Sequence, residues 1–205
     1  MKARTRVESQ ATRERLLDAA ERLFAQKGYT GVTLRDIATE VGIRHTSLYH
    51  HVPGGKQQLF IEVSERHFLR HQQGLEGAIA GAASDIRSRL CAVADWLLSQ
   101  PPMDLVRMVH VDMPAIDGHQ AKRLSEVAYT SLLVPIEMLL RQAQQQGEIE
   151  YRNHGLVAGG FLGMIESLYA VPDTALLHSR EYMAYELIDT ILSGLRPRSN
   201  GVSER

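Results

Sequence analysis

Apolar residues recur at intervals of three and four along almost the whole chain, which is the spacing of one face of an α-helix. No alternating run of β-branched residues bounded by turn residues indicates a strand. The pattern predicts an all-α fold of about nine helices. They cover about 10–27, 34–41, 45–51, 56–80, 83–99, 103–112, 118–146, 153–171 and 177–194. Pro135 is expected to kink the helix over 118–146, because proline removes a backbone donor and clashes with the preceding turn.

The segment from residue 33 to residue 56 is typical of a helix-turn-helix. Thr33 and Asp36 form the pattern of a capping box at a helix N-terminus. Gly42 then supplies the backbone freedom that a tight turn between two helices needs. The second helix has a thin apolar face made of Ile43, Leu48 and Val52. Its polar face is therefore expected to be free for the major groove of DNA.

The preceding helix has an apolar face of Leu16, Ala20, Leu23 and Phe24, and Gly28 follows at the position of a C-cap glycine. The run ERLLDAAERLFAQKGYTGVTLRDIATEVGIRHTSLYHH, with Lys56 and Leu59 beyond it, resembles the TetR family of bacterial transcriptional regulators. The resemblance covers about the first third of the chain.

The resemblance implies a helix-turn-helix DNA-binding domain over 1–55 and an effector-binding and dimerisation domain over 56–205. It implies a homodimeric repressor that binds a palindromic operator in double-stranded DNA and is released by a small-molecule effector. Arg44 departs from the family, which often has a small hydroxyl residue at this position to cap the recognition helix.

The expected DNA contacts are donors on or beside the recognition helix. Arg44 is the strongest candidate for a base contact, because a guanidinium can bind guanine in a bidentate manner. Tyr49 and Lys56 match family positions that commonly contact phosphate, although the ring of Tyr49 could instead pack inside the domain. The full set is Thr33, Arg44, His45, Thr46, Ser47, Tyr49, His50 and Lys56.

The last two predicted helices carry more apolar surface than a monomer's final hairpin is expected to expose. In the resembled family they pair with their twofold mates as a four-helix dimer interface. The alternative is that they only cap the core of one protomer. The interface residues expected here are Gly159, Gly163, Tyr182, Tyr185, Ile188 and Leu192.

An effector pocket in the second domain would use soft and aromatic side chains with a few polar anchors. The same residues at helical spacing also suit an ordinary core. The candidates are His67, Trp96, Met108, His110, Met113, Tyr129, Phe161 and Met164, with Met138 as a further soft side chain and Asp112 as a further polar anchor.

Charge is distributed unevenly along the chain. Residues 1–56 hold 10 lysines and arginines against 6 aspartates and glutamates, and residues 57–205 hold 13 against 18. A basic N-terminal third on an acidic remainder fits a DNA-reading segment. A protein that coats DNA regardless of sequence would need a broader basic surface than residues 57–205 offer.

Catalytic and metal-binding signals are missing from the sequence. No nucleophile elbow, zinc-protease helix or phosphate-binding glycine loop is present, so an enzyme is not expected and no cofactor is predicted. His45 and His50 lack the spacing of a zinc pair. The single cysteine, Cys91, excludes an intrachain disulfide and is expected to be a buried structural thiol. Without a signal peptide or a membrane-length apolar run, the protein is expected to be soluble and cytoplasmic.

Overall fold

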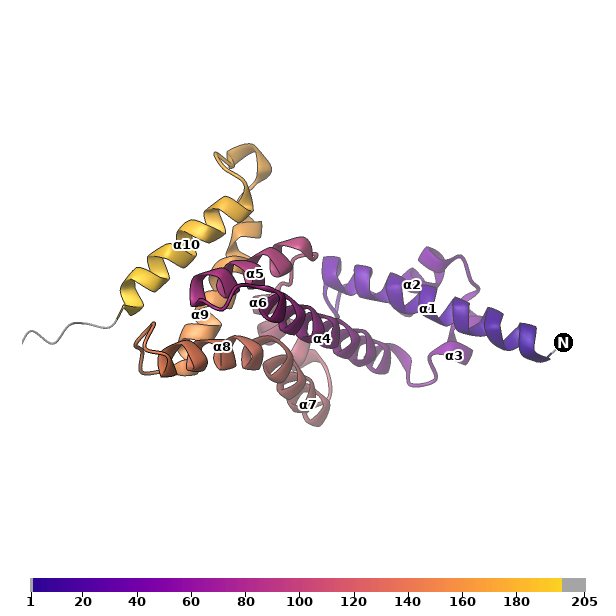
Figure 1. The fold of residues 1–205 in the computed structure, drawn as a ribbon. Helices are drawn as coiled ribbons and strands as arrows, with labels where there is room; N and C mark the ends of the chain where they lie inside the picture. Colours follow the sequence, from indigo (N-terminus) through magenta and orange to yellow (C-terminus); the bar gives the residue numbers. More distant parts are fainter. Residues whose placement is uncertain (1, 197–205) are drawn as a thin grey trace, which may run out of the picture. The chain divides into compact units, whose positions relative to one another are not determined.

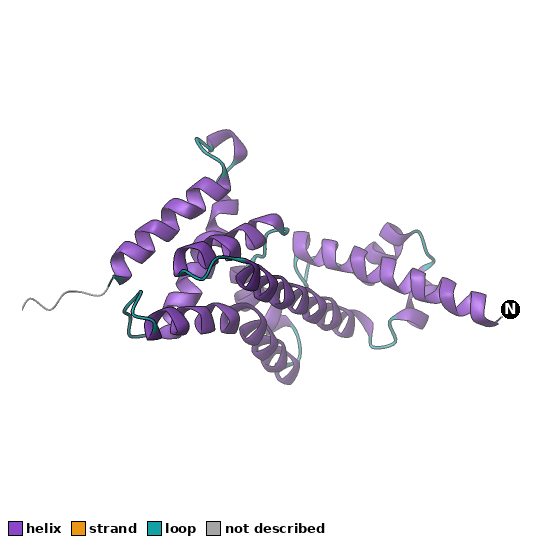
Figure 2. Cartoon of the chain, in the orientation of Figure 1, coloured by secondary structure: helices purple, strands orange, loops and turns teal. Residues whose placement is uncertain are grey.

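The computed structural model describes the backbone of residues 2–196 and the side chains of residues 10–196. All regular structure within this range is helical (Figure 2), which confirms the all-α prediction. None of the helices in this range combines the length and the apolar character needed to cross a membrane.

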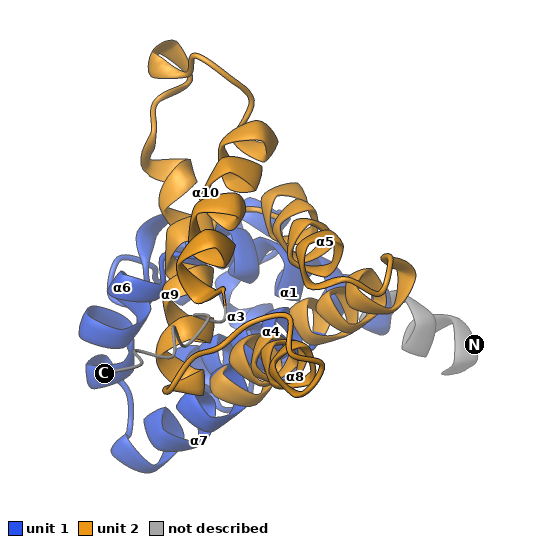
Figure 3. Cartoon of the chain, turned by 60° about the vertical axis from the view of Figure 1, so that its left-hand side comes forward, with its two compact units in different colours: residues 1–69, 103–128 blue, residues 70–102, 129–205 orange. Residues whose placement is uncertain are grey.

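The described chain divides into two units (Figure 3). Unit 1 comprises residues 1–69 and 103–128, and unit 2 comprises residues 70–102 and 129–205. The units follow packing, so they differ from the functional division predicted at residues 55 and 56. That functional division stays a prediction.

Unit 1 contains the helix-turn-helix and a second segment from later in the chain (Figure 1). Its elements are α1 (Lys2–Lys27), α2 (Leu34–Val41), α3 (His45–His51), the first part of α4 (Gly55–Gly81), α6 (Leu105–Arg107), a π-helical turn (Met108–Asp112), a 3-10 turn (Met113–Ala115) and α7 (Gly118–Ala128).

Unit 2 contains the last part of α4 and the C-terminal helices. Its further elements are α5 (Ile86–Ser99), a π-helical turn (Tyr129–Leu133), α8 (Val134–Gln145), α9 (His154–Ser167), 3-10 turns at Leu168–Ala170 and Asp173–Ala175, and α10 (Arg180–Leu195).

Several helix boundaries differ from the predicted ones. α1 begins eight residues earlier than expected. α5 begins later, because the carboxylate of Asp85 accepts from the Ser88 backbone N–H and so fixes the start of the helix. The predicted helix over 103–112 is one α turn followed by a π turn, and its 3-10 end continues through Pro114 to Ala115.

The predicted disruption at Pro135 occurs, but it takes a different form from a simple kink. The chain widens into the π turn Tyr129–Leu133 and resumes as α8, with Pro135 in its first turn. Proline is tolerated there because the first N–H groups of a helix have no partner within the helix. The π turn therefore separates α7 from α8 within the range predicted as one helix.

Several residues of unit 2 differ in burial or in contacts from what the sequence predicted. Phe161 and Ile188 are fully buried within the protomer, so neither is available to an effector or to a partner. The hydroxyl of Tyr185 donates to Asp95 at 2.8 Å, and this bond raises the pKa of Tyr185 to about 12. Cys91 is only partly buried, so the prediction of a buried thiol holds in part. Desolvation raises the pKa of this thiol.

A glycine in α4 makes room for the single tryptophan of the chain. A β-carbon placed on Gly74 would lie 2.0 Å from the indole ring of Trp96 in α5. Such an approach is far inside van der Waals contact, so the ring depends on the missing side chain. A β-carbon on Gly77, one turn further along α4, would meet nothing within 4 Å.

Gly74→Ala is expected to lower the free energy of unfolding by about 1–3 kcal/mol, because the added methyl displaces the indole. Gly77→Ala is the matched control and should raise it by roughly 1 kcal/mol, because alanine favours the helix. Thermal melts and the emission maximum of Trp96 measure both effects. Equal shifts in the two variants would contradict the tight packing of Trp96.

Candidate nucleic-acid interface

The first helix of the helix-turn-helix begins with the predicted capping box. The hydroxyl of Thr33 accepts from the backbone N–H of Asp36 at 3.2 Å, and the Asp36 carboxylate accepts from the backbone N–H of Thr33 at 2.8 Å. The Thr33 hydroxyl also donates to this carboxylate at 2.7 Å. These bonds stabilise the ionised carboxylate, and they lower the pKa of Asp36. The ionised carboxylate of Asp36 therefore stabilises the start of α2 above the usual range of an aspartate pKa. This stabilisation is lost as the pH falls through the lowered pKa of Asp36.

The turn after α2 depends on the left-handed conformation of Gly42. Its φ is 74°, and the next backbone N–H, of Ile43, reaches back to the carbonyl of Ala38 at 2.9 Å. Arg15 of α1 donates to the carbonyl of Val41 at 2.8 Å and so satisfies another group at the end of α2. The direction of α3 is set by this turn and by these backbone bonds.

α3 has one buried position and a broad polar face. Leu48 is fully buried and Val52, just past the helix, is nearly so, whereas Ile43 is only partly buried. Ser47 is half-buried. The exposed side chains are those predicted: Arg44, His45, Thr46, Tyr49 and His50. Tyr49 is 50% exposed, and its ring meets the His45 imidazole edge-on, so it does not pack inside the domain.

Arg44 occupies the N-cap position of α3 and makes no side-chain cap. The first N–H groups of this seven-residue helix therefore lack the acceptor that serine or threonine would supply. The departure from the family pattern has a structural consequence. α3 starts without a side-chain cap, and the side chain of Arg44 is exposed instead.

Lys56 binds within unit 1, at the loop between α1 and α2. Its ammonium donates to the carbonyls of Tyr29 and Val32, each at 3.0 Å, and lies 4.2 Å from the centre of the Tyr29 ring. The Tyr29 ring in turn lies 5.0 Å from that of Phe60, by their centroids. Lys56 thus holds this loop in place, and its predicted phosphate contact would have to share the ammonium with these carbonyls.

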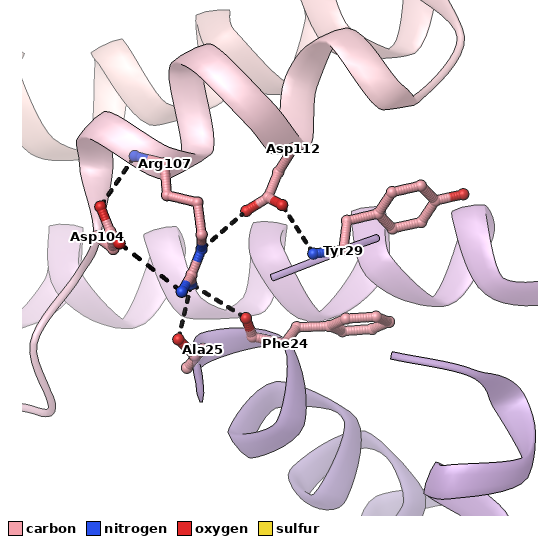
Figure 4. Close-up of polar contacts among 6 residues, drawn as sticks. All are labelled: Phe24, Ala25, Tyr29, Asp104, Arg107 and Asp112. Atoms are coloured by element: carbon pink, nitrogen blue, oxygen red, sulfur yellow. Dashed lines mark hydrogen bonds and ion pairs between the residues drawn. The ribbon is translucent and has the colours of Figure 1, made fainter. Parts of the chain in front are cut away.

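An ion pair between a partly exposed arginine and a buried aspartate holds the end of α1 against the segment that follows residue 103 (Figure 4). Arg107 donates to the last carbonyls of α1, at 3.2 Å to Phe24 and 2.7 Å to Ala25. Its Nε lies 3.4 Å from the Asp112 carboxylate, which also accepts from the backbone N–H of Tyr29 at 2.7 Å. Asp112 is 2% exposed. We call this arrangement the Arg107–Asp112 clamp.

The π-helical turn explains how two residues five apart reach the same helix end. In an α-helix, residues at i and i+5 are offset by about 140° around the axis. A π turn bonds i to i+5, as the Met113 N–H does to the Met108 carbonyl, and aligns such residues. Regular helical spacing could not reveal this pairing, so sequence reasoning missed Arg107 and assigned Asp112 to a pocket.

The clamp also requires a glycine at residue 28. Gly28 has a φ of 71° and ends α1, with its N–H bonded to the Phe24 carbonyl. A β-carbon there would lie 2.9 Å from a carboxylate oxygen of Asp112. The predicted C-cap is confirmed, and Gly28 also allows the close approach of Asp112.

The eight residues predicted to line an effector pocket divide between the two units. Four belong to unit 1 and four to unit 2. Within unit 1, His67 faces Glu21 at 3.1 Å and Met113 is buried. Those in unit 1 are His67, Met108, His110 and Met113, and those in unit 2 are Trp96, Tyr129, Phe161 and Met164.

Comparison with known proteins agrees with this architecture. Residues 16–63 match the profile of the bacterial regulatory proteins of the tetR family. The chain is 53% identical over 51 residues to the transcriptional regulator LmrA of Bacillus subtilis, a match that covers 25% of this chain and 27% of LmrA. It is 40% identical over 81 residues to the transcriptional repressor KstR2 of Rhodococcus jostii, covering 40% of this chain and 39% of KstR2. These matches span less than half the length of the curated relatives.

The fold extends the likeness beyond the matched segment. The structure of AibR in complex with isovaleryl coenzyme A and operator DNA aligns with a TM-score of 0.69 at 20% identity, over 92% of this chain and all of that one. Residues 16–63 are therefore similar to the N-terminal segment of tetR-family regulators, and the fold of the chain is similar to that of AibR. The relatives named here are transcriptional regulators rather than enzymes.

Arg107→Met should lower the free energy of unfolding by about 3 kcal/mol, because it leaves the buried Asp112 carboxylate without its guanidinium. The matched control is Arg22→Met, which removes an exposed pair with Glu40 and should cost less than about 1 kcal/mol. Urea denaturation measures both. Adding Asp112→Asn to Arg107→Met should recover part of the loss, and equal effects of the two single variants would contradict the clamp.

Proposed function

We propose that this protein is a homodimeric transcriptional repressor that binds a palindromic operator and is released by a small-molecule effector. The observation that carries the proposal is the exposed polar face of α3, presented on a buried Leu48 within a helix-turn-helix. A side chain on such a face can reach base edges in the major groove.

Residues 1–55 would form the DNA-binding domain and residues 56–205 the effector-binding and dimerisation domain. Arg44, His45, Thr46, Ser47 and His50 would contact bases or the adjacent backbone. Thr33, Tyr49 and Lys56 would contact phosphates. Thr33 and Lys56 already serve as cap and loop anchor, so their phosphate contacts would add to a structural role.

The apolar faces of α9 and α10 support a dimer. On α9, Leu156, Gly160 and Gly163 recur at helical spacing and are exposed, and Leu156 is 71% exposed. A β-carbon on either glycine would meet nothing in the protomer, so a second backbone can approach closely there. The exposed stripe centres on Gly160, whereas the predicted Gly159 is half-buried. Tyr182 on α10 is exposed, as an interface residue must be in the isolated protomer.

Two observations support release by a small molecule: a complex of a structural relative, and candidate pocket residues in unit 2. AibR was crystallised with both isovaleryl coenzyme A and operator DNA. An effector releases DNA only if it binds the DNA-incompetent conformation much more tightly than the competent one. The predicted pocket residues of unit 2 that remain partly or well exposed are Trp96, Tyr129 and Met164.

Arg44→Ser tests the base contact in a protein that should be more stable than the wild type. Serine supplies the missing cap of α3 and should raise the free energy of unfolding by about 1 kcal/mol. Loss of a guanidinium contact to a base should weaken operator binding by about tenfold and relax sequence preference. Gel-shift titration with DNA from upstream of the protein's own gene measures the effect.

The control is Arg152→Ser, which removes an exposed arginine outside the helix-turn-helix and should leave DNA affinity within about twofold. Wild-type binding that excess unrelated DNA abolishes as readily as operator DNA would overturn the repressor proposal. Unchanged affinity and preference in Arg44→Ser would remove Arg44 from the interface.

Leu156→Glu is expected to convert the wild-type dimer into a monomer, because it places a charge in the proposed apolar interface. The matched control is Met138→Glu, which alters another exposed apolar side chain, on α8, and should leave the dimer intact. Sedimentation velocity at micromolar concentration distinguishes the species. A monomeric wild type, or a dimeric Leu156→Glu, would contradict the proposed interface.

A further inference from the structure

A groove of about 590 Å³ lies between α4, α5 and α8, wholly within unit 2. Its volume is in the range of small-molecule sites. The groove contains none of the eight pocket candidates that divide between the two units, but Met138, which the sequence also suggested for a pocket lining, is part of it.

Two hydrogen bonds define the ends of the groove. At one end, Ser131 lies 3.4 Å from Gln72 of α4, next to the lining residue Thr130. At the other end, Arg89 of α5 donates to Gln142 of α8 at 2.8 Å. The lining residues of α4 run from Gln72 to Ala80, which is about 12 Å of helix.

The end beside α5 is basic. Arg89 uses one terminal nitrogen to bind Gln142, while its Nε is buried and has no hydrogen-bond partner within the described residues. Arg141 lines the same groove, and its guanidinium is 3.6 Å from the Glu137 carboxylate and largely exposed. Arg89 and Arg141 thus bring two guanidinium groups to one groove, and an anion bound there would be attracted to both.

The middle of the groove is apolar. Ile79 of α4 faces Val134, Pro135, Met138 and Leu139 of α8 across it. Met138 is 65% exposed, an unusual position for a flexible apolar side chain that adapts readily to ligands.

A negative charge lies between the arginines and the Gln72 end of the groove. Glu76 lines the groove one turn after Gln72 and accepts from the amide of Gln72 at 3.0 Å. A ligand with a second anionic group at this end would be repelled. The groove therefore has cations at its α5 end and a carboxylate one helical turn in from its Gln72 end.

We propose that this groove binds a small amphipathic anion with a single charged headgroup. The headgroup, a carboxylate or a group of similar charge, binds Arg89 and Arg141. The apolar body lies along Ile79 and Met138, with its uncharged tail toward Gln72 and Glu76. This site does not depend on DNA binding, so its test leaves the proposed repressor function untouched.

The test uses octanoate as the probe and the full-length protein without DNA, with binding measured by isothermal titration calorimetry. Octanoate should bind, whereas 1-octanol, which lacks the charge, should bind at least tenfold more weakly. Octanedioate should also bind more weakly than octanoate, because its second carboxylate approaches Glu76. Arg89→Gln should weaken octanoate binding by about tenfold to a hundredfold.

Arg87→Gln is the matched control, since Arg87 lies on the same helix but pairs with Asp189 outside the groove. It should change octanoate affinity by less than about twofold. Circular dichroism checks that each variant is folded. Met138→Asp gives a second test at an exposed position, and it should weaken octanoate by adding a negative charge to the groove.

Three results would each overturn the proposal. The first is the absence of octanoate binding up to millimolar concentration. The second is equal affinity for octanoate and 1-octanol. The third is an equal effect of Arg89→Gln and Arg87→Gln in folded protein, because a general charge effect would then explain the binding.

Discussion

α3 can present its polar face only because Leu48 is fully buried against the rest of unit 1. A helix of seven residues is too short to persist alone in water, and this one begins without a side-chain cap. Its order therefore comes from packing, from the Gly42 turn and from the bond between Arg15 and the end of α2. The surface proposed to read DNA is rigid only as far as these few supports are intact.

The same dependence extends to residues distant in sequence. Lys56 and the Arg107–Asp112 clamp both hydrogen-bond to the loop after α1. Both bind backbone groups between residues 24 and 32, so both depend on the conformation of that loop, to which the left-handed Gly28 contributes. A change in the geometry of residues 104–112 would therefore alter the hydrogen bonds that these residues make to the end of α1.

Regular periodicity made most of the fold predictable from the sequence. The bounds of α2 and α3, the capping box at Thr33 and the glycine turn all follow from local rules, and the structure confirms them. The clamp was beyond such rules, because a π turn breaks the helical spacing on which they depend. Ile188 was misassigned for a different reason, since an apolar residue on a terminal helix has the same pattern whether its own protomer or a partner covers it.

The groove in unit 2 shows another limit. It is formed by the spacing of α4, α5 and α8, and its basic end joins Arg89 to Arg141, which are far apart in the sequence. No sequence motif indicates that these two arginines line the same groove. The helix-turn-helix could be recognised because its residues lie within a few consecutive turns.

The π turn at Met108–Asp112 has a consequence for how this sequence can change. Each residue inserted into or deleted from a helix rotates everything beyond it by about 100°. Arg107 and Asp112 face the same neighbour across five positions because of the π turn. Point substitutions elsewhere in this turn leave that alignment untouched, whereas a single-codon insertion between the two would turn the carboxylate away from α1. Between these two residues, a fixed chain length constrains evolution more than residue identity does.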